Sequence, residues 1–355
     1  MNKSNKAVIK NTLLGLALAG VPALASADVT LRFSDWMPLS HHTVAQGANV
    51  FIEKVEALSE GQINIQYFPA EQIGKAADKL SLAQTGVADM VSIAPAYISD
   101  RLPLSGVIEL PGIYDGACSG SYAFAELTKP GGVLAEQEYT PNGVRVLFVG
   151  AQGPYRALTT ERQLNSIEDF SGLRVRTAGG PMDMLARELD AVSVRLSGPD
   201  VLPSLTRGTL DGVFWPLQSV ESWGLKDALG HMTPNVSVGS FNIVFAISER
   251  SWNRLSPELQ DILVEAGEQA TRAHCEFIEA NEEKTIDDLI ASGIESTPLS
   301  ADDVRQVEAS YQQIADSWAN RLSERNLAGN EVLEAFTDAV ANVNDSMATT
   351  MDRGE

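Results

Sequence analysis

Two arginines, Arg174 and Arg176, occupy alternate positions in the stretch SGLRVRTAGGPMDMLARELD, residues 171–190. A guanidinium group offers a planar set of N–H donors that matches a carboxylate, and it keeps its charge at physiological pH. The chain as a whole is acidic, with a formal net charge of −21. Two arginines so close together in such a chain fit a local site for a small anion, and they fit equally well a pair of exposed residues that balance nearby acids.

The elements predicted around these arginines place Arg176 where ligands commonly bind. Residues 172–177 have the pattern of a strand, and residues 181–190 that of a helix with proline at its first position. The loop between them lies at the carboxyl end of the strand, and ligands of open α/β sheets collect there. Arg176 lies next to this loop, whereas Arg174 lies one pleat further away. Gly179 would let the loop backbone approach a ligand closely.

A second arginine and several aromatic residues have similar positions relative to predicted strands. Arg156 follows a Gly-x-x-Gly-Pro turn at residues 150–154. Trp215 follows a strand that ends at Phe214, and we expect Trp215 to form an apolar wall of the site and Phe214 to pack in the core. The aromatic residues expected to shape the site are Trp36, Tyr97, Phe214, Trp215 and Phe241. These residues predict an anion site with apolar walls.

Sequence motifs of common enzymes are absent from the chain. It contains no G-x-S-x-G, H-E-x-x-H, C-x-x-C, P-loop or G-x-G-x-x-G sequence. His41 and His42 are adjacent, so on a helix their side chains would point about 100° apart and would not share a metal ion. His231 and His274 are isolated in the sequence. We therefore expect no cofactor, no metal site and no catalysis, and an exported hydrolase is the least favoured alternative.

The amino-terminal 27 residues have the features of a signal peptide. A start with three lysines precedes an apolar run at residues 13–24, and Ala-Ser-Ala at residues 25–27 fits the small-x-small cleavage pattern. We expect cleavage after Ala27 and export to the periplasm, with an uncleaved membrane anchor as the alternative. Loss of the lysines makes the mature chain still more acidic, which disfavours nucleic acid and anionic membranes as partners.

The two cysteines, Cys118 and Cys275, could pair in an oxidising compartment. Both lie in helix-like segments, and nothing in the sequence brings them together. The sequence therefore favours buried free thiols over a disulfide.

The order of predicted elements indicates an α/β fold with two units. Strands alternate with helices in the first unit, which favours a mostly parallel sheet covered on both faces. A second unit of similar length follows. A helical pattern from Ser256 to about Leu289 is long enough to lie across both units. In the first unit, strands are predicted at 29–33, 62–68 and 88–94, and helices at 40–59 and 75–84.

Three stretches of the mature chain resemble the periplasmic solute-binding proteins of TRAP (tripartite ATP-independent periplasmic) transporters. They are YFPAEQIGKAADKLSLAQTGVADM at 67–90, VIELPGIY at 107–114, and the block at 166–216 that contains both arginines. The resemblance implies two α/β lobes, each built from discontinuous segments, with a ligand cleft between them and a long helix spanning both. It implies lobe I at 28–153 plus about 242–281, and lobe II at 154–241 plus about 282–355.

The resemblance also implies a function and roles for particular residues. Arg176 would bind the carboxylate of an organic acid, and Arg156 would be a second arginine of the cleft. Trp215 stands where several relatives have asparagine, which favours a ligand with an apolar or aromatic part. Gly198 stands where some relatives have an aromatic residue, which would enlarge the pocket. The expected protein is a monomeric receptor that delivers its ligand to TRAP membrane subunits for ion-gradient-driven uptake, with the receptor of another importer type as the alternative.

Overall fold

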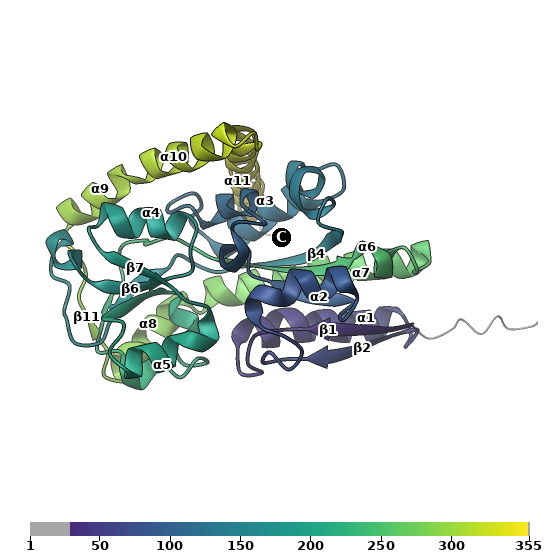
Figure 1. Ribbon diagram of the computed structural model, residues 1–355, viewed down its shortest axis with the longest axis horizontal. Helices are drawn as coiled ribbons and strands as arrows, with labels where there is room; N and C mark the ends of the chain where they lie inside the picture. Colours follow the sequence, from purple (N-terminus) through teal and green to yellow (C-terminus); the bar gives the residue numbers. More distant parts are fainter. Residues whose placement is uncertain (1–28, 354–355) are drawn as a thin grey trace, which may run out of the picture.

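The computed structural model describes residues 29–353, so the predicted signal peptide and its cleavage site lie outside the described residues. Two α/β lobes lie side by side, each built on one sheet (Figure 1). This arrangement confirms the predicted two-lobed fold. Within residues 29–353, no helix has the length and apolar character needed to cross a membrane.

The first lobe is built on a five-stranded sheet in the order β2-β1-β3-β10-β4. As predicted, β1 pairs in parallel with β2 and β3, while β10 runs antiparallel between β3 and β4. Because β10 enters this sheet after the chain has passed through the second lobe, the first lobe is assembled from separate segments. The strands are β1 (Val29–Ser34), β2 (Ile63–Phe68), β3 (Met90–Ile93), β4 (Val144–Ala151) and β10 (Asn242–Ser248).

The second lobe is built on a six-stranded sheet in the order β11-β9-β5-β8-β6-β7. β6 pairs in parallel with β7 and β8, and β5 runs antiparallel to β8 and β9. The carboxyl end of β6, which carries Arg176, therefore lies in the middle of the parallel part of the sheet. The strands are β5 (Arg156–Thr159), β6 (Arg174–Thr177), β7 (Val192–Arg195), β8 (Gly212–Trp215), β9 (His231–Thr233) and β11 (Glu295–Ser296).

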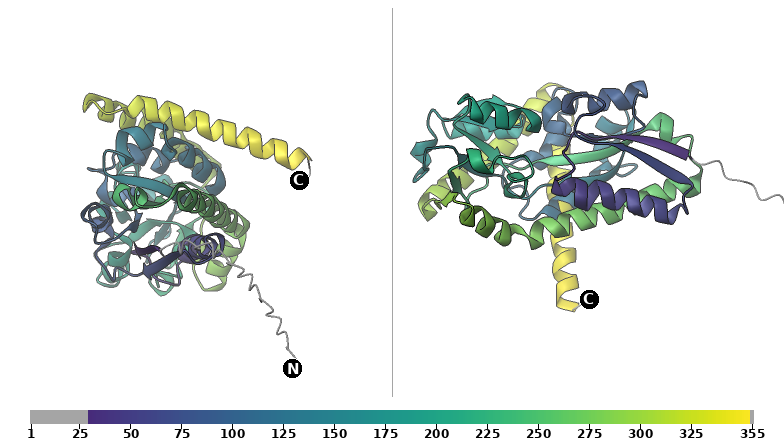
Figure 2. Two further views of the ribbon diagram at one scale, coloured as in Figure 1. Left: turned by 90° about the vertical axis from the view of Figure 1, so that its right-hand side faces the viewer. Right: turned by 90° about the horizontal axis from the view of Figure 1, so that it is seen from below.

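The predicted long helix is present as two consecutive helices that together run beneath both lobes (Figure 2). Ser256 begins the first of them by accepting a hydrogen bond from the backbone N–H of Leu259. The break falls at Asn281, whose side chain donates to the carbonyl of Phe277 at 2.8 Å. These helices are α7 (Pro257–Ala280) and α8 (Glu282–Ala291); the preceding ones are α1 (Asn49–Leu58), α2 (Lys79–Thr85), α3 (Ala117–Thr128), α4 (Pro181–Glu188), α5 (Val201–Thr206) and α6 (Glu249–Trp252).

Three further helices, α9 (Ala301–Ala309), α10 (Tyr311–Glu324) and α11 (Gly329–Arg353), close the chain. α10 packs against α4 of the second lobe, and α11 packs against α3 of the first. The far end of α11 projects from the body of the molecule (Figure 2). The carboxyl-terminal segment therefore contacts both lobes.

Cys118 of α3 and Cys275 of α7 form a disulfide bond. The expectation of free thiols was wrong because α3 and α7 pack side by side and bring the two Cα atoms within 4.7 Å. The bond joins positions 157 residues apart in the sequence.

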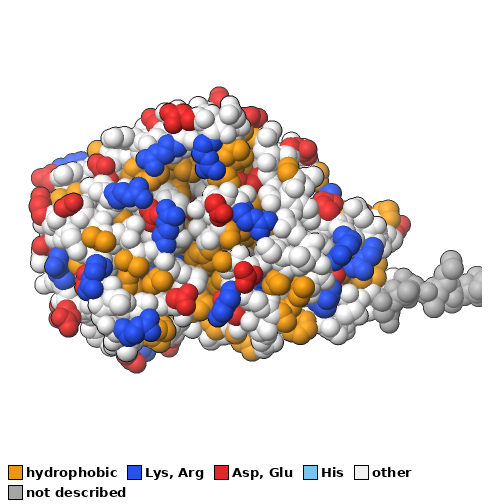
Figure 3. All heavy atoms as spheres, viewed as in Figure 1, with side chains coloured by type: hydrophobic (Ala, Val, Ile, Leu, Met, Phe, Trp, Pro, Cys, Tyr) orange, Lys and Arg blue, Asp and Glu red, His pale blue; other side chains and the backbone are white. Residues whose placement is uncertain are grey.

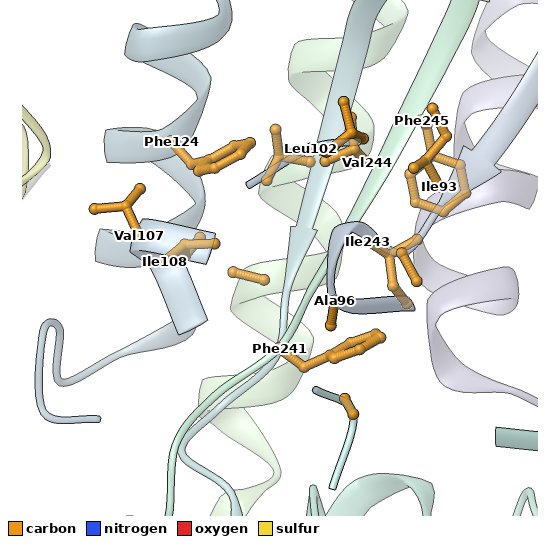
Figure 4. Close-up of a cluster of buried hydrophobic side chains, with 14 of the residues drawn as sticks. Ile93, Ala96, Leu102, Val107, Ile108, Phe124, Phe241, Ile243, Val244 and Phe245 are labelled. Carbon is orange, nitrogen blue, oxygen red and sulfur yellow. The ribbon is translucent and has the colours of Figure 1, made fainter. Parts of the chain in front are cut away.

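The hydrophobic core of the first lobe continues along β10 to the boundary between the lobes. Phe241, Ile243 and Phe245 share one face of the chain by strand alternation, while Val244 faces the other side, toward Leu102 (Figure 4). Phe241 lies at the end of this row, directly before the strand begins. The strand that fills the core thus also directs an aromatic side chain toward the second lobe.

Candidate functional site

A small cavity, which the surrounding side chains nearly fill, lies between the two lobes. Arg176, Trp36, Tyr97, Trp215 and Phe241, all predicted from the sequence, line it together. The remaining lining residues are His41, Gln152, Tyr155, Pro216, Ser219, Trp223 and Ile243. The cavity thus combines one guanidinium group with six large aromatic side chains.

Arg176 is fully buried, with 0% of its surface exposed. Its Nε donates to the carbonyl of Leu196 at 2.9 Å, Nη1 donates to the carbonyl of Phe214 at 3.4 Å, and Nη2 donates to the hydroxyl of Tyr97 at 3.1 Å. Because a guanidinium carries five N–H donors, these bonds leave one N–H on each terminal nitrogen. Two N–H donors of the guanidinium therefore remain for a bound anion.

No carboxylate of residues 29–353 lies within 4.0 Å of the Arg176 guanidinium. Its surroundings are aromatic instead, since the guanidinium carbon lies 4.5 Å from the ring centroid of Trp215 and 6.0 Å from that of Tyr97. Burial raises the pKa of Tyr97, so its hydroxyl stays neutral. A buried charge without a counter-ion is costly, and a bound anion relieves that cost.

The aromatic walls pack against one another around the cavity. Trp36 stacks on Trp223, with ring centroids 5.8 Å apart and planes 19° apart, and meets Tyr97 edge-on at 5.4 Å. Trp215 meets Trp223 edge-on at 6.3 Å. The indole N–H groups of Trp36 and Trp215 are buried without a hydrogen-bond partner in the described chain. Both tryptophans belong to the lining of the cavity.

Trp223 lines the cavity but was not predicted from the sequence. The glycine at position 198, where some relatives have an aromatic residue, was the only sequence feature related to it. A Cβ atom on Gly198 would lie 3.0 Å from Cζ2 of Trp223, so the glycine makes room for the indole ring. The expectation that Gly198 enlarges the pocket was therefore wrong, because Trp223 fills the space. The ring of Trp223 thus packs directly against Gly198, in space that a side chain at position 198 would need.

Three predicted site residues do not line the cavity. Arg156 forms an ion pair with Glu282 at 3.1 Å. The ring of Phe214, which was also predicted as a site residue, packs in the core instead, and only its carbonyl reaches Arg176. Gly179 has a φ of +110°, and a Cβ there would lie 3.0 Å from the carbonyl oxygen of Ala96. Its role in this structure is to allow close contact between the lobes rather than with a ligand. The weaker candidate, Arg174, forms an exposed ion pair with Asp211.

Three buried histidines, which are separated in the sequence, stack beside the cavity. The ring centroids of His41 and His42 lie 4.3 Å apart, and those of His42 and His274 lie 5.7 Å apart. Each ring bonds a polar neighbour: His41 Nε2 lies 3.0 Å from Ser219 Oγ, His42 Nε2 lies 2.9 Å from Gln152 Oε1, and His274 Nε2 lies 3.0 Å from Thr43 Oγ1. No group of His, Cys, Asp or Glu among the described residues is arranged to hold a metal ion.

This histidine cluster predicts a loss of stability in acid. Burial lowers the pKa of His42 from 6.5 to about 4 and places those of His41 and His274 well below their ordinary value. At these histidines, the unfolded chain therefore binds more protons than the folded one between pH 4 and 6.5, so their contribution to stability falls as pH falls through this window. His42 alone should cost about 2–3 kcal/mol of unfolding free energy by pH 4.5.

Urea unfolding of the wild type and His42→Gln at pH 7 and pH 4.5 measures this effect. Glutamine retains a donor for Gln152, and the difference between the two proteins cancels the carboxyl groups that titrate in the same range. We expect the wild type to lose about 2–3 kcal/mol more than the variant on acidification. Equal losses in both proteins would contradict the prediction.

A family model described as bacterial extracellular solute-binding protein, family 7, matches residues 35–321. A solute-binding protein of Roseobacter denitrificans is 26% identical over 267 residues, which cover 71% of this chain and 79% of that protein. A TRAP solute-binding protein from Rhodoferax ferrireducens, crystallised with copurified benzoate, matches with a TM-score of 0.82 at 21% identity and covers 90% of this chain and 99% of that one. A TRAP periplasmic solute-binding protein from Bordetella bronchiseptica with bound (R)- and (S)-mandelate matches with a TM-score of 0.78 at 25% identity and covers 89% and 99%.

Proposed function

The chain belongs to the bacterial extracellular solute-binding proteins of family 7, the receptors of TRAP transporters, and we propose that it captures a small aromatic monocarboxylate through Arg176. One observation carries the proposal: a buried guanidinium, with no carboxylate of residues 29–353 within 4.0 Å of it, lies in a small cavity with aromatic walls. The ligand carboxylate would accept the two remaining N–H groups of Arg176, and its ring would lie against the aromatic walls. The benzoate and mandelate bound by two similar structures are of this chemical class.

The position of the cavity between the lobes explains how a ligand would favour the closed form. Closure of the lobes removes water from the site, and an ion pair is stronger in such surroundings than in bulk water. A ligand that contacts both lobes shifts the population toward the closed form, because it binds that form more tightly. The protein performs no chemistry on its ligand in this scheme, and a single chain completes the site.

Delivery and location complete the proposal. The closed receptor passes its ligand to TRAP membrane subunits, which use an ion gradient for uptake. Cleavage after Ala27 releases the mature chain into the periplasm, where the family is found. Mass spectrometry of the exported protein would identify its first residue, and any start other than Asp28 would contradict the cleavage site.

A thermal-shift screen with benzoate, 3-hydroxybenzoate, mandelate, succinate and galacturonate tests the proposed ligand class. A ligand that binds only the folded protein raises the melting temperature. We expect the three aromatic acids to raise it and benzyl alcohol, which lacks the carboxylate, to have no effect. A shift with succinate or galacturonate but with none of the aromatic acids would contradict the proposal.

Replacing Trp223 by alanine should weaken binding of benzoate about 10- to 100-fold. The change removes one aromatic wall and its stack on Trp36, and burial of one aromatic side chain against a ligand is worth about 1–3 kcal/mol. Trp223→Phe is the matched control and should retain most of the affinity. Calorimetry measures both variants, and an affinity of Trp223→Ala within twofold of the wild type would exclude Trp223 as a contact of the ring.

A further inference from the structure

A groove beside α4 and α10 collects four arginines in a chain with a net charge of −21. Lys and Arg side chains gather over these two helices on the face shown in Figure 3. No acidic residue lines the groove. The arginines are Arg187, Arg195, Arg321 and Arg325.

Three of the four guanidinium groups have no carboxylate of residues 29–353 within 4.0 Å. Arg195 forms an ion pair with Asp183, and Arg321 donates to the hydroxyl of Ser317 at 3.1 Å. Arg187 and Arg325 are exposed, and no carboxylate within residues 29–353 lies within 4.0 Å of either. Helix dipoles account for arginines near the ends of α4 and α10. Helix dipoles do not explain why the ends of both helices meet at one groove. The arginines there repel one another, and a bound anion would relieve this repulsion.

The residues that line the groove indicate what kind of anion it would bind. Its lining includes the half-buried Pro103 and Met184 and the buried Pro181, Trp318 and Leu322, so a small apolar surface lies among the arginines. A segment that carries both acidic and apolar side chains complements such a surface. A broad anionic surface such as a lipid bilayer would instead meet the repulsion of the acidic chain as a whole.

The groove is formed by both lobes together. Ser99, Pro103 and Gly106 come from the first lobe, and Gly180 and Pro181 come from the second. They meet closely, since a Cβ on Gly106 would lie 3.1 Å from Nε1 of Trp318 and 3.5 Å from Pro181. Separation of the lobes would divide this lining. A partner that binds the whole groove therefore recognises the closed arrangement of the lobes.

We propose that this groove docks an acidic, partly apolar segment of the transporter's membrane subunits and reports closure of the receptor to them. The proposal rests on the proposed function, which supplies the partner and the reason for sensing closure. Docking through the groove is distinct from ligand binding, because none of the four arginines lines the cavity that contains Arg176.

The double variant Arg187→Glu/Arg325→Glu tests the proposal, with Lys54→Glu/Arg207→Glu as a control of equal charge change. All four side chains are exposed, and the control residues lie outside the groove. Binding to the membrane subunits encoded with this chain, reconstituted in nanodiscs, is measured by interferometry at low and high salt, together with uptake into proteoliposomes. We expect the groove variant to bind and support uptake at least about tenfold less well than the control, with wild-type ligand affinity.

Each outcome of this experiment supports or contradicts docking of the membrane subunits at the groove. Binding and uptake by the groove variant within twofold of the control would overturn the docking proposal. Loss of binding to phosphatidylglycerol vesicles in the groove variant, with subunit binding intact, would assign the groove to lipid and also overturn it. A wild type that binds none of the carboxylates would overturn the proposed function, while interferometry with the nanodiscs would still decide the docking role.

Discussion

Replacing Arg176 by methionine is expected to weaken carboxylate binding at least about 100-fold. Removing one partner of a buried charged contact costs about 2–5 kcal/mol, and about 3 kcal/mol corresponds to this loss of affinity. The unliganded protein should change little in stability. Loss of the hydrogen bonds to Leu196, Phe214 and Tyr97 is offset by removal of a buried charge that has no counter-ion.

Arg176→Lys separates the effect of charge from that of geometry. Lysine retains the positive charge but not the planar pair of donors, so its affinity should lie between those of the wild type and of Arg176→Met. Calorimetry with benzoate gives the affinities, and urea unfolding confirms that each variant is folded. If Arg176→Met binds benzoate within a few-fold of the wild-type affinity, Arg176 does not bind the ligand carboxylate.

The residues that the sequence predicted best are those whose position depends on local pattern. Arg176 follows from the period of a strand and from the loop after it, and both are properties of about ten consecutive residues. Trp36 and Tyr97 follow two strands of the first sheet, and Trp215 ends a strand beside β6 in the second. Within each sheet, the carboxyl ends of parallel strands meet at one edge. The same reasoning gave the parallel pairing of β1 with β2 and β3.

The residues that were missed or misplaced depend on contacts between distant segments. Trp223 reaches the cavity only because Gly198 leaves space for it. Arg156 has the local pattern of a site residue, but Glu282 at the start of α8 pairs with it, and no local rule predicts that partner. His274 joins His42 because α7 passes behind the first strand-to-helix loop, a contact between segments more than 200 residues apart. The break at Asn281 leaves the apolar period nearly unchanged, so periodicity alone did not reveal it.

The Cys118–Cys275 bond is expected to contribute about 3–5 kcal/mol to the free energy of unfolding. A cross-link stabilises a protein chiefly by restricting its unfolded chain, and the effect grows with the length of the closed loop, here with a sequence separation of 157 between the linked positions. Cys118→Ser/Cys275→Ser should therefore unfold at a lower urea concentration than the wild type. Ligand affinity should not change, because neither cysteine lines the cavity that contains Arg176.

Reduction provides the control, because dithiothreitol should destabilise the wild type by a similar amount and leave the double serine variant unaffected. The bond closes a small apolar cluster that includes Ala117 and Ile278, with Met347 of α11 packed against it. Two serine hydroxyls in that cluster would add a cost of their own, which reduction of the wild type does not share. A variant that loses stability while the reduced wild type does not would therefore show that the cluster, rather than the cross-link, holds α3 against α7.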